Sequence, residues 1–190
     1  DMNVIGVEAN ADLANKTRKK LDKAGLLGNR ISIFSGSLEQ LNFTSYFANL
    51  IVSDKLVVST EFPTDMKEIY RLLKPGGGIA FLGQMKKLSE NDVKSWFAKI
   101  DQSEWQVVDS KGTWGKLERK PLEGAGEWTH LYAGASNTAA TSDKLVSNET
   151  QTQWFGRPGP RDMTDRHHRH VAPLYKNGRM YIPGDNRIIA

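Results

Sequence analysis

Residues 71–78 read Arg-Leu-Leu-Lys-Pro-Gly-Gly-Gly and join two kinds of predicted element. Apolar or aromatic side chains at positions 66, 69 and 70 before this stretch, and at 73 within it, have a spacing that places them on one helix face. Pro63 suits the first turn of that helix. Proline and glycine then stop the helix, and residues 79–82 are typical of a buried strand. The stretch therefore predicts a helix, a tight turn and a strand in succession.

The same alternation of strands and helices runs through residues 1–120. Strand-like runs occur at 3–7, 31–34, 48–53, 79–82, 105–108 and 113–117. Helical spacing occurs at 11–24 and at 93–100, the second behind a capping-box pattern that begins at Ser89. In the first of these helices we expect Leu13, Thr17, Leu21 and Ala24 to lie on one face. Strands that alternate with helices of this length predict an α/β fold with a mostly parallel sheet.

The choice of basic residue changes near position 120. Residues 1–120 carry 14 Lys and 4 Arg, whereas residues 121–190 carry 2 Lys and 6 Arg. Pro121, Gly124 and Gly126 stand at the same place, and such punctuation is typical of a domain boundary. We therefore expect an α/β domain at 1–120 and a β-rich segment at 121–190, with a hairpin around residues 184–186.

Composition excludes several classes of function. The chain has 190 residues and no cysteine, which rules out disulfides, thiolate metal sites and cysteine nucleophiles. Its apolar runs are far shorter than the roughly 20 residues that span a bilayer, so no membrane span is expected. The net charge of +4 comes from 26 basic and 22 acidic residues that are mixed along the sequence. This mixing gives no indication of a nucleic-acid partner.

Glu8 follows the first strand-like run and is the first candidate site residue. Ligands of open parallel sheets bind beyond the carboxyl ends of the strands, where a carboxylate can accept hydrogen bonds from both hydroxyls of a ribose. In dinucleotide folds this carboxylate lies about 20 residues after a glycine-rich turn. Counting back from Glu8 passes the beginning of the chain, so we expect that turn and its strand to lie outside this sequence. A solvated strand-end acid is the alternative.

Residues 1–119 resemble a class I S-adenosylmethionine-dependent methyltransferase entered at its second strand. The resemblance rests on residues 4–8 (Val-Ile-Gly-Val-Glu), 36–41 (Gly-Ser-Leu-Glu-Gln-Leu), 49–54 (Asn-Leu-Ile-Val-Ser-Asp) and 71–77 (Arg-Leu-Leu-Lys-Pro-Gly-Gly). It implies a Rossmann-like sheet, incomplete without the first strand and the glycine loop, and S-adenosylmethionine as the cofactor. In the family's sheet order the first strand lies between the second and fourth, so exposed strand edges are expected.

The resemblance also implies roles for five residues. Glu8 would contact the cofactor ribose, Ser37 and Leu38 the edge and face of the adenine, and Ser53 or Asp54 the region next to the methyl group. The family usually has Asp where Ser37 stands, and often Asp where Asn49 stands. Ser37 as a turn residue and Asp54 as a loop acid remain alternatives. The sequence assigns neither a catalytic residue nor the methyl acceptor.

Residues 121–190 resemble the opening of a pyrroloquinoline-quinone (PQQ)-like β-propeller. The resemblance rests on residues 128–134 with 137–138, 153–159 and 178–190, which combine aromatic residues, glycines and a Gly-Arg strand. A blade takes roughly 40–50 residues and 4–8 blades close a ring, so at most one blade fits here. A PQQ site on the axis of a completed ring is therefore not expected.

Residues 165–170, Asp-Arg-His-His-Arg-His, form the other pattern of this half. Its three histidines, His167, His168 and His170, leave a metal site, an anion-binding or partner-binding loop and a plain polar loop open. The interleaved arginines repel a cation, so no metal ligand is assigned.

Taken together, the two resemblances imply a fragment of a fusion protein. The favoured function is methyl transfer from S-adenosylmethionine to an unassigned acceptor, and a quinone-dependent dehydrogenase or a non-catalytic binding scaffold is the alternative. The expected partner is a small-molecule cofactor. The methyltransferase part favours the cytoplasm and the propeller part favours export, so no compartment or oligomeric state is assigned.

Overall fold

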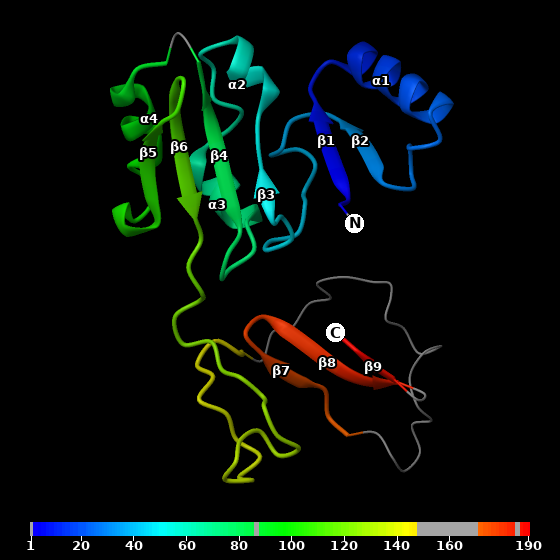
Figure 1. Cartoon of the computed structure of the whole chain (residues 1–190), viewed down its shortest axis with the longest axis vertical. Helices are drawn as coiled ribbons and strands as arrows, with labels where there is room; N and C mark the ends of the chain where they lie inside the picture. The colour runs from blue at the N-terminus through cyan, green and yellow to red at the C-terminus, as the bar shows by residue number, and fades with distance from the viewer. Residues whose placement is uncertain (1, 86–87, 148–170, 185–186) are drawn as a thin grey trace. The chain divides into compact units, whose positions relative to one another are not determined.

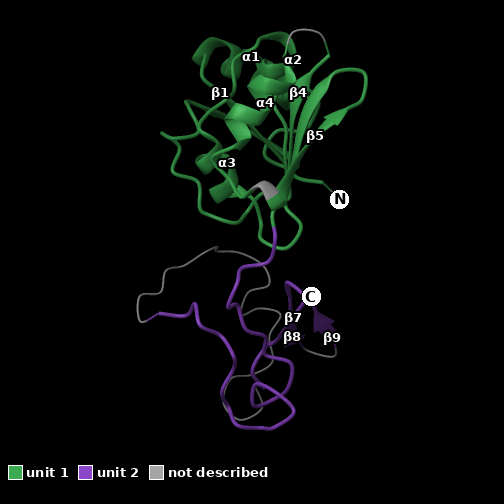
Figure 2. Ribbon diagram, turned by 90° about the vertical axis from the view of Figure 1, so that its left-hand side faces the viewer, with its two compact units in different colours: residues 1–119 green, residues 120–190 purple. Residues whose placement is uncertain are grey.

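The computed structural model describes residues 2–85, 88–147, 171–184 and 187–190. The chain divides into two compact units, Asp1–Arg119 and Lys120–Ala190 (Figure 2). The predicted histidine cluster at 165–170 and the aromatic pattern at 153–159 lie outside the described residues. No helix in the described part of the chain is long and apolar enough to cross a membrane.

The first unit is an α/β unit with two separate sheets (Figure 1). Its elements are β1 (Val4–Glu8), α1 (Ala11–Lys23), β2 (Ile31–Ser35), β3 (Leu50–Ile51), α2 (Asp54–Val58), α3 (Met66–Leu72), β4 (Ile79–Gln84), α4 (Glu90–Phe97), a 3-10 turn η1 (Gln102–Glu104), β5 (Trp105–Asp109) and β6 (Thr113–Glu118). β1 and β2 form a parallel pair. The second sheet has the order β3-β4-β6-β5, in which β3 and β4 are parallel and β6 is antiparallel to both its neighbours.

The core of the first unit lies between the second sheet and the helices α2 to α4. Ala80 and Leu82 alternate along β4 toward this core, as expected for a strand with one face buried. Phe97 of α4 fits against β6 only because position 115 is glycine, since a Cβ atom there would overlap the Phe97 ring. The other fully buried side chains of the cluster include Leu56, Met66, Ile69, Leu73, Val93 and Leu117.

α1 forms where the sequence predicts it, but of the four residues expected on its apolar face only Leu21 is partly buried. Leu13 is 51% exposed and Thr17 and Ala24 are exposed, whereas Ala14 is completely buried. The helix is turned because the Arg18 guanidinium lies against β2, where Nε and Nη2 donate to the Ile33 carbonyl at 3.0 and 2.9 Å. The helical period was therefore predicted correctly and its orientation was not.

The end of β3 and the start of α3 also differ from the prediction. The strand expected over 48–53 is only Leu50–Ile51, because the Ser53 hydroxyl accepts a hydrogen bond from the Leu56 N–H and begins α2, a helix that the sequence did not predict. Pro63 lies before α3 and not in its first turn, since Asp65 is the N-cap. The capping box at Ser89 is confirmed, with reciprocal hydrogen bonds between Ser89 and Asp92.

β1 and β3 each have an edge without a strand partner among the described residues. Both strands run toward the same end of the unit in Figure 1, with α1 and α2 following them there. Exposed apolar side chains mark both strands: Val4 and Ile5 on β1, and Leu50 on β3. The expectation of a mostly parallel sheet is therefore only partly met: β1–β2 and β3–β4 are parallel, whereas both pairings of β6 are antiparallel, and the strands form two separate sheets. The expected exposed strand edges are observed.

The second unit contains one antiparallel sheet in the order β7 (Leu174–Lys176), β8 (Arg179–Gly184) and β9 (Arg187–Ile189). Asn177 and Gly178, both with positive φ, form the tight turn between β7 and β8. The pairing of β8 with β9 confirms the hairpin expected around residues 184–186. Outside the sheet, Trp128 bridges to Tyr175. No closed sheet occurs in the described part of this unit.

Candidate functional site

The predicted site residues follow the carboxyl ends of β1, β2 and β3. Glu8 is the last residue of β1, and its Oε1 accepts a hydrogen bond from the Asn10 N–H at 2.7 Å. Asn10 in turn caps α1, because its Oδ1 accepts from the N–H groups of Asp12 and Leu13. The Glu8 carboxylate is therefore held by the turn that starts α1, while Oε2 has no hydrogen-bond partner among the described residues.

A backbone hydrogen bond connects the loop after β2, which carries Ser37 and Leu38, to Glu8 at the end of β1. The Gly36 N–H donates to the Glu8 carbonyl at 3.0 Å, and Gly36 has a φ of 139°, which favours glycine. The Ser37 N–H donates to Gln40 Oε1 at 3.2 Å. Leu38 is half-buried and packs against the core cluster, so part of its side chain is already in contact with protein.

Ser53 and Asp54 follow β3 at the start of α2. The Ser53 hydroxyl accepts from the Leu56 N–H at 3.2 Å, which is the capping bond of that helix. Asp54 is exposed in the first helical turn, where a negative charge is favourable. Ser53 thus has a structural role in addition to the one that the sequence resemblance implies.

Two interactions involve residues at the carboxyl ends of both sheets. The Thr64 hydroxyl donates to Glu39 Oε1, which ties the loop after β2 to the segment before α3. The pKa of Lys55 is raised above its usual value, first by its hydrogen bond to Glu61 and the charge of that residue, and further by the Glu8 carboxylate.

Three residues near the carboxyl ends of the strands were not predicted from the sequence. Gln84 at the end of β4 is 3% exposed and its Nε2 donates to the Ser59 carbonyl at 2.9 Å, which holds the end of α2. A polar residue at the end of an apolar strand was the available signal. Lys55 and Glu61 form an exposed ion pair at 2.8 Å, and nothing in their spacing predicts it.

The carboxyl ends of β1, β2 and β3 offer hydrogen-bond acceptors and hydroxyl groups. No group of three potential metal ligands occurs among the described residues. Glu8, Ser37 and Ser53 supply one carboxylate and two hydroxyls, chemistry that suits neutral polar groups such as sugar hydroxyls and ring nitrogens. The backbone hydrogen bond between Gly36 and Glu8 brings Glu8 and the 36–41 loop together. Ser53 and Asp54 follow β3, which belongs to the other sheet.

Residues 1–77 match the family model described as a methyltransferase domain. The match includes Glu8, Ser37, Leu38, Ser53 and Asp54. It confirms the predicted resemblance to methyltransferases for this part of the chain. The match ends at residue 77, so it gives no support to the propeller resemblance of residues 121–190. No curated protein matches the sequence.

Solved structures with a similar fold include methyltransferases. A protein from Methanococcus maripaludis assigned as an S-adenosyl-L-methionine-dependent methyltransferase aligns with a TM-score of 0.54 and 21% identity, over 65% of this chain and 69% of that chain. An S-adenosylmethionine-dependent methyltransferase from Aquifex aeolicus aligns with a TM-score of 0.41 and 14% identity, over 61% and 68% of the two chains. The first similarity confirms the predicted Rossmann-like α/β fold.

Proposed function

We propose that the first unit performs S-adenosylmethionine-dependent methyl transfer. The observation that carries the proposal is the gathering of Glu8 and the 36–41 loop at the carboxyl ends of β1 and β2, within the residues that match a methyltransferase domain. In open α/β sheets this edge is where ligands bind. The methyl acceptor is not assigned.

Glu8 is the residue that fits a cofactor contact best. Its Oε1 is held by the Asn10 N–H, and its Oε2 has no partner among the described residues and can accept a hydrogen bond from a ribose hydroxyl. The half-buried position limits competition from water. A neutral amide in place of the carboxylate would keep the shape and lose one strong acceptor, so Glu8 should contribute mainly to affinity.

The other four residues have narrower roles in the proposal. The Ser37 hydroxyl is proposed to contact the adenine edge, and Leu38 contacts the adenine face with the part of its side chain that the core leaves uncovered. Ser53 accepts the capping hydrogen bond but can still donate its own proton. Ser53 and Asp54 would lie next to the reactive methyl group, which the bound cofactor supplies as an electrophile. Transfer then depends chiefly on alignment with the acceptor.

Affinity for the cofactor should be low in the 190-residue chain. The sheet that carries Glu8 and the sheet that carries Ser53 share no strand pairing among the described residues, so their separation is not fixed by a hydrogen-bonded ladder. We expect binding weaker than micromolar. Calorimetry that measured micromolar binding would contradict this expectation.

Nuclear magnetic resonance titration with S-adenosylmethionine at millimolar concentration tests the proposal under these conditions. Amide shifts should be confined to residues 8–10, 36–41 and 53–56. Glu8→Gln should weaken the response several-fold, because one charged acceptor is worth about 1–2 kcal/mol. Glu118→Gln is the matched control, since Glu118 ends β6 opposite the first residue of β4 and so lies at the other edge of the sheet. Shifts elsewhere, or equal effects of both variants, would refute the proposed site.

The propeller resemblance of residues 121–190 remains a separate proposal. It is supported by the antiparallel order β7-β8-β9 and by the tight Asn177-Gly178 turn before the Gly-Arg strand. Further Gly-Arg repeats in the parent sequence after Ala190 would support it, and a continuation without such repeats would contradict it. A non-catalytic scaffold is favoured if the cofactor titration produces no shifts at all.

A further inference from the structure

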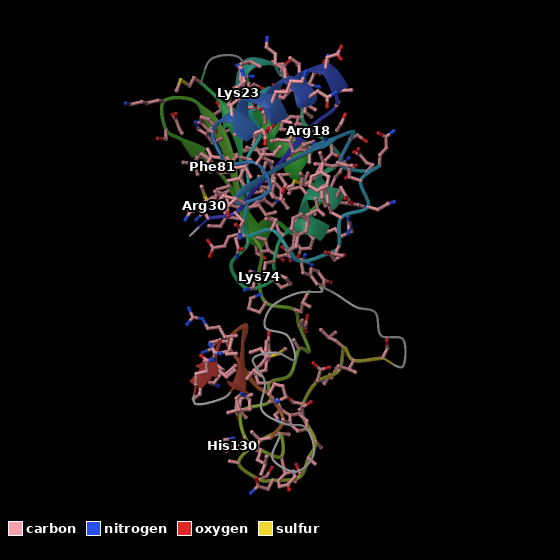
Figure 3. The ribbon with its side chains drawn as sticks, turned by 90° about the vertical axis from the view of Figure 1, so that its right-hand side faces the viewer. Arg18, Lys23, Arg30, Lys74, Phe81 and His130 are labelled. Carbon is pink, nitrogen blue, oxygen red and sulfur yellow. The ribbon has the colours of Figure 1, made fainter. Side chains whose placement is uncertain are left out.

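The solvent-facing side of α1 carries a stripe of four lysines, Lys16, Lys19, Lys20 and Lys23, all exposed. With about 100° of rotation per residue, the four side chains fall within an arc of roughly 100°. Ala14 and Leu21 lie on the opposite side of the helix, where Ala14 is completely buried. Figure 3 looks onto α1 and labels Arg18 and Lys23 on it. The fold thus sorts mixed sequence charges into a one-sided basic surface.

The four amino groups of this stripe are not neutralised by acidic neighbours. None of them forms a hydrogen bond or ion pair with another residue that the structure describes. Five lysines elsewhere differ, because Lys55, Lys94, Lys99, Lys116 and Lys176 each pair with a carboxylate. Lys67, Lys74, Lys111 and Lys144 are single lysines that form no ion pair among the described residues, and they do not form a stripe on one helix. Of the two acids on α1, Asp22 lies outside the arc, whereas Asp12 lies within it, four residues before Lys16, and forms no ion pair with that lysine in the structure.

The stripe opposes the stability of its own helix. Its members are related by spacings of three and four residues in four pairs, and like charges at these spacings repel each other. Lys20 and Lys23 lie in the last turn, where the helix dipole favours a positive charge, but this does not apply to Lys16. An anionic partner would relieve the repulsion along the whole stripe.

The spacing of the stripe fits a nucleic-acid backbone. Lys16 and Lys23 are separated by seven residues, or about 10.5 Å along the helix axis. Four consecutive phosphates of one duplex strand advance about 10 Å along the duplex axis, at roughly 3.4 Å each, which matches this length when α1 lies along that axis. A bilayer surface is a poorer fit, because an interfacial helix inserts its apolar face, and here Ala14 and Leu21 of that face pack on the unit itself.

We propose that the lysine stripe of α1 is a docking surface for the phosphate backbone of nucleic acid, bound without base recognition. This departs from the sequence expectation of no nucleic-acid partner, which rested on charges that are mixed along the chain but separated on α1. The proposal does not depend on methyl transfer. Contacts of this kind position a protein on a duplex and depend strongly on salt.

Fluorescence anisotropy of a labelled duplex of about 20 base pairs tests the docking surface with the full chain. Four phosphate contacts predict a slope of about −3.6 for log K against log salt, or roughly a 100-fold loss of affinity between about 50 and 200 mM salt. The variant Lys16→Gln/Lys19→Gln/Lys20→Gln/Lys23→Gln should remove this slope. Its matched control, Lys55→Gln/Lys94→Gln/Lys99→Gln/Lys116→Gln, loses the same charge from ion-paired positions and should retain most of the slope.

Three outcomes would overturn the proposal. The first is that the wild-type chain does not bind the duplex at low salt. The second is that both quadruple variants lose the slope equally, which would indicate net charge rather than the stripe. The third is that the chain binds anionic phospholipid vesicles or polyglutamate as tightly as the duplex. Circular dichroism of each variant confirms that α1 is retained, and α1-variant helicity at or above wild type is expected because the repulsion is gone.

Discussion

Arg119, the last residue of the first unit, should be one of its strongest single contributors to stability. The side chain is 5% exposed, and Nη1 donates to the carbonyls of Tyr70 and Leu73 at 2.7 and 2.8 Å. Both carbonyls lie at the end of α3, where the Tyr70 carbonyl also accepts from the Leu73 N–H and the Leu73 carbonyl has no intrahelical donor. The guanidinium also lies over the rings of Tyr46 and Tyr70, at 4.6 and 4.2 Å from their centroids.

Arg119→Ala should lower the free energy of unfolding of the first unit by about 3 kcal/mol. Two charge-assisted hydrogen bonds are lost, and the Leu73 carbonyl is left without a partner among the described residues at a cost of about 1–3 kcal/mol, whereas the Tyr70 carbonyl keeps its hydrogen bond from the Leu73 N–H. The two cation–π contacts add about 0.5–1 kcal/mol each. Part of this loss is offset, because the variant no longer has to desolvate the buried guanidinium charge. That cost includes Nε, which has no hydrogen-bond partner among the described residues. Backbone hydrogen bonds of Arg119 with Gly76, Gly77 and Gly78 are unchanged by the substitution.

Urea unfolding of residues 1–119, followed by tryptophan fluorescence, measures this difference. Arg119→Lys should recover less than half of the loss, because an ammonium group cannot span two carbonyls and stack on two rings as a planar fork does. Lys74→Ala is the control, since Lys74 is exposed on the same turn. A loss below about 1 kcal/mol for Arg119→Ala, with an unchanged denaturant slope, would refute the capping argument.

Three further predictions concern packing, capping and pH. Gly115→Ala should destabilise the first unit by about 2 kcal/mol or more in urea, because the new methyl group overlaps the Phe97 ring, and a change within about 0.5 kcal/mol would contradict this. Ser89→Ala should lower the stability of the same unit by about 1 kcal/mol in thermal unfolding, with Ser89→Asp largely neutral. Hydrogen bonds from the N–H groups of Gly126, Val146 and Leu145 hold the pKa of the Asp143 carboxyl below its usual value. Its contribution to the second unit is therefore complete above the usual carboxyl pKa and lost as pH falls through the lowered one, and Asp143→Asn should remove that acid-side loss when amide signals are followed during acid titration.

The sequence predicted the elements of the first unit better than their orientation. The period of α1 was readable from its apolar residues, but Leu13 proved exposed and Ala14 buried. The deciding contact is a hydrogen bond from Arg18 to a β2 carbonyl, which hydrophobic periodicity does not encode. α2 was missed for a related reason, because its five residues are too few for a period and its start depends on the Ser53 cap.

The same distinction applies to the candidate site. Glu8 and the 36–41 loop could be located because strand ends are visible in the sequence, and their proximity follows from parallel pairing of β1 with β2. The Glu39–Thr64 hydrogen bond and the buried Gln84 could not, since each depends on which loops meet after the sheets are formed. Contacts between loops that are distant in sequence therefore could not be predicted from the sequence.

How firmly the two sheets are held together should decide how well the site binds its cofactor. The described contacts between their carboxyl ends include the Glu39–Thr64 hydrogen bond and the packing of Leu38 on the core. An exposed hydrogen bond contributes about 1 kcal/mol, so these contacts restrain the Glu8 to Ser53 separation only weakly. Cofactor binding must fix the distance between Glu8 and Ser53, and the entropy lost in fixing it lowers the affinity. Any partner or segment that pairs with the free edges of β1 and β3 would remove that cost, and should raise cofactor affinity without contacting the cofactor.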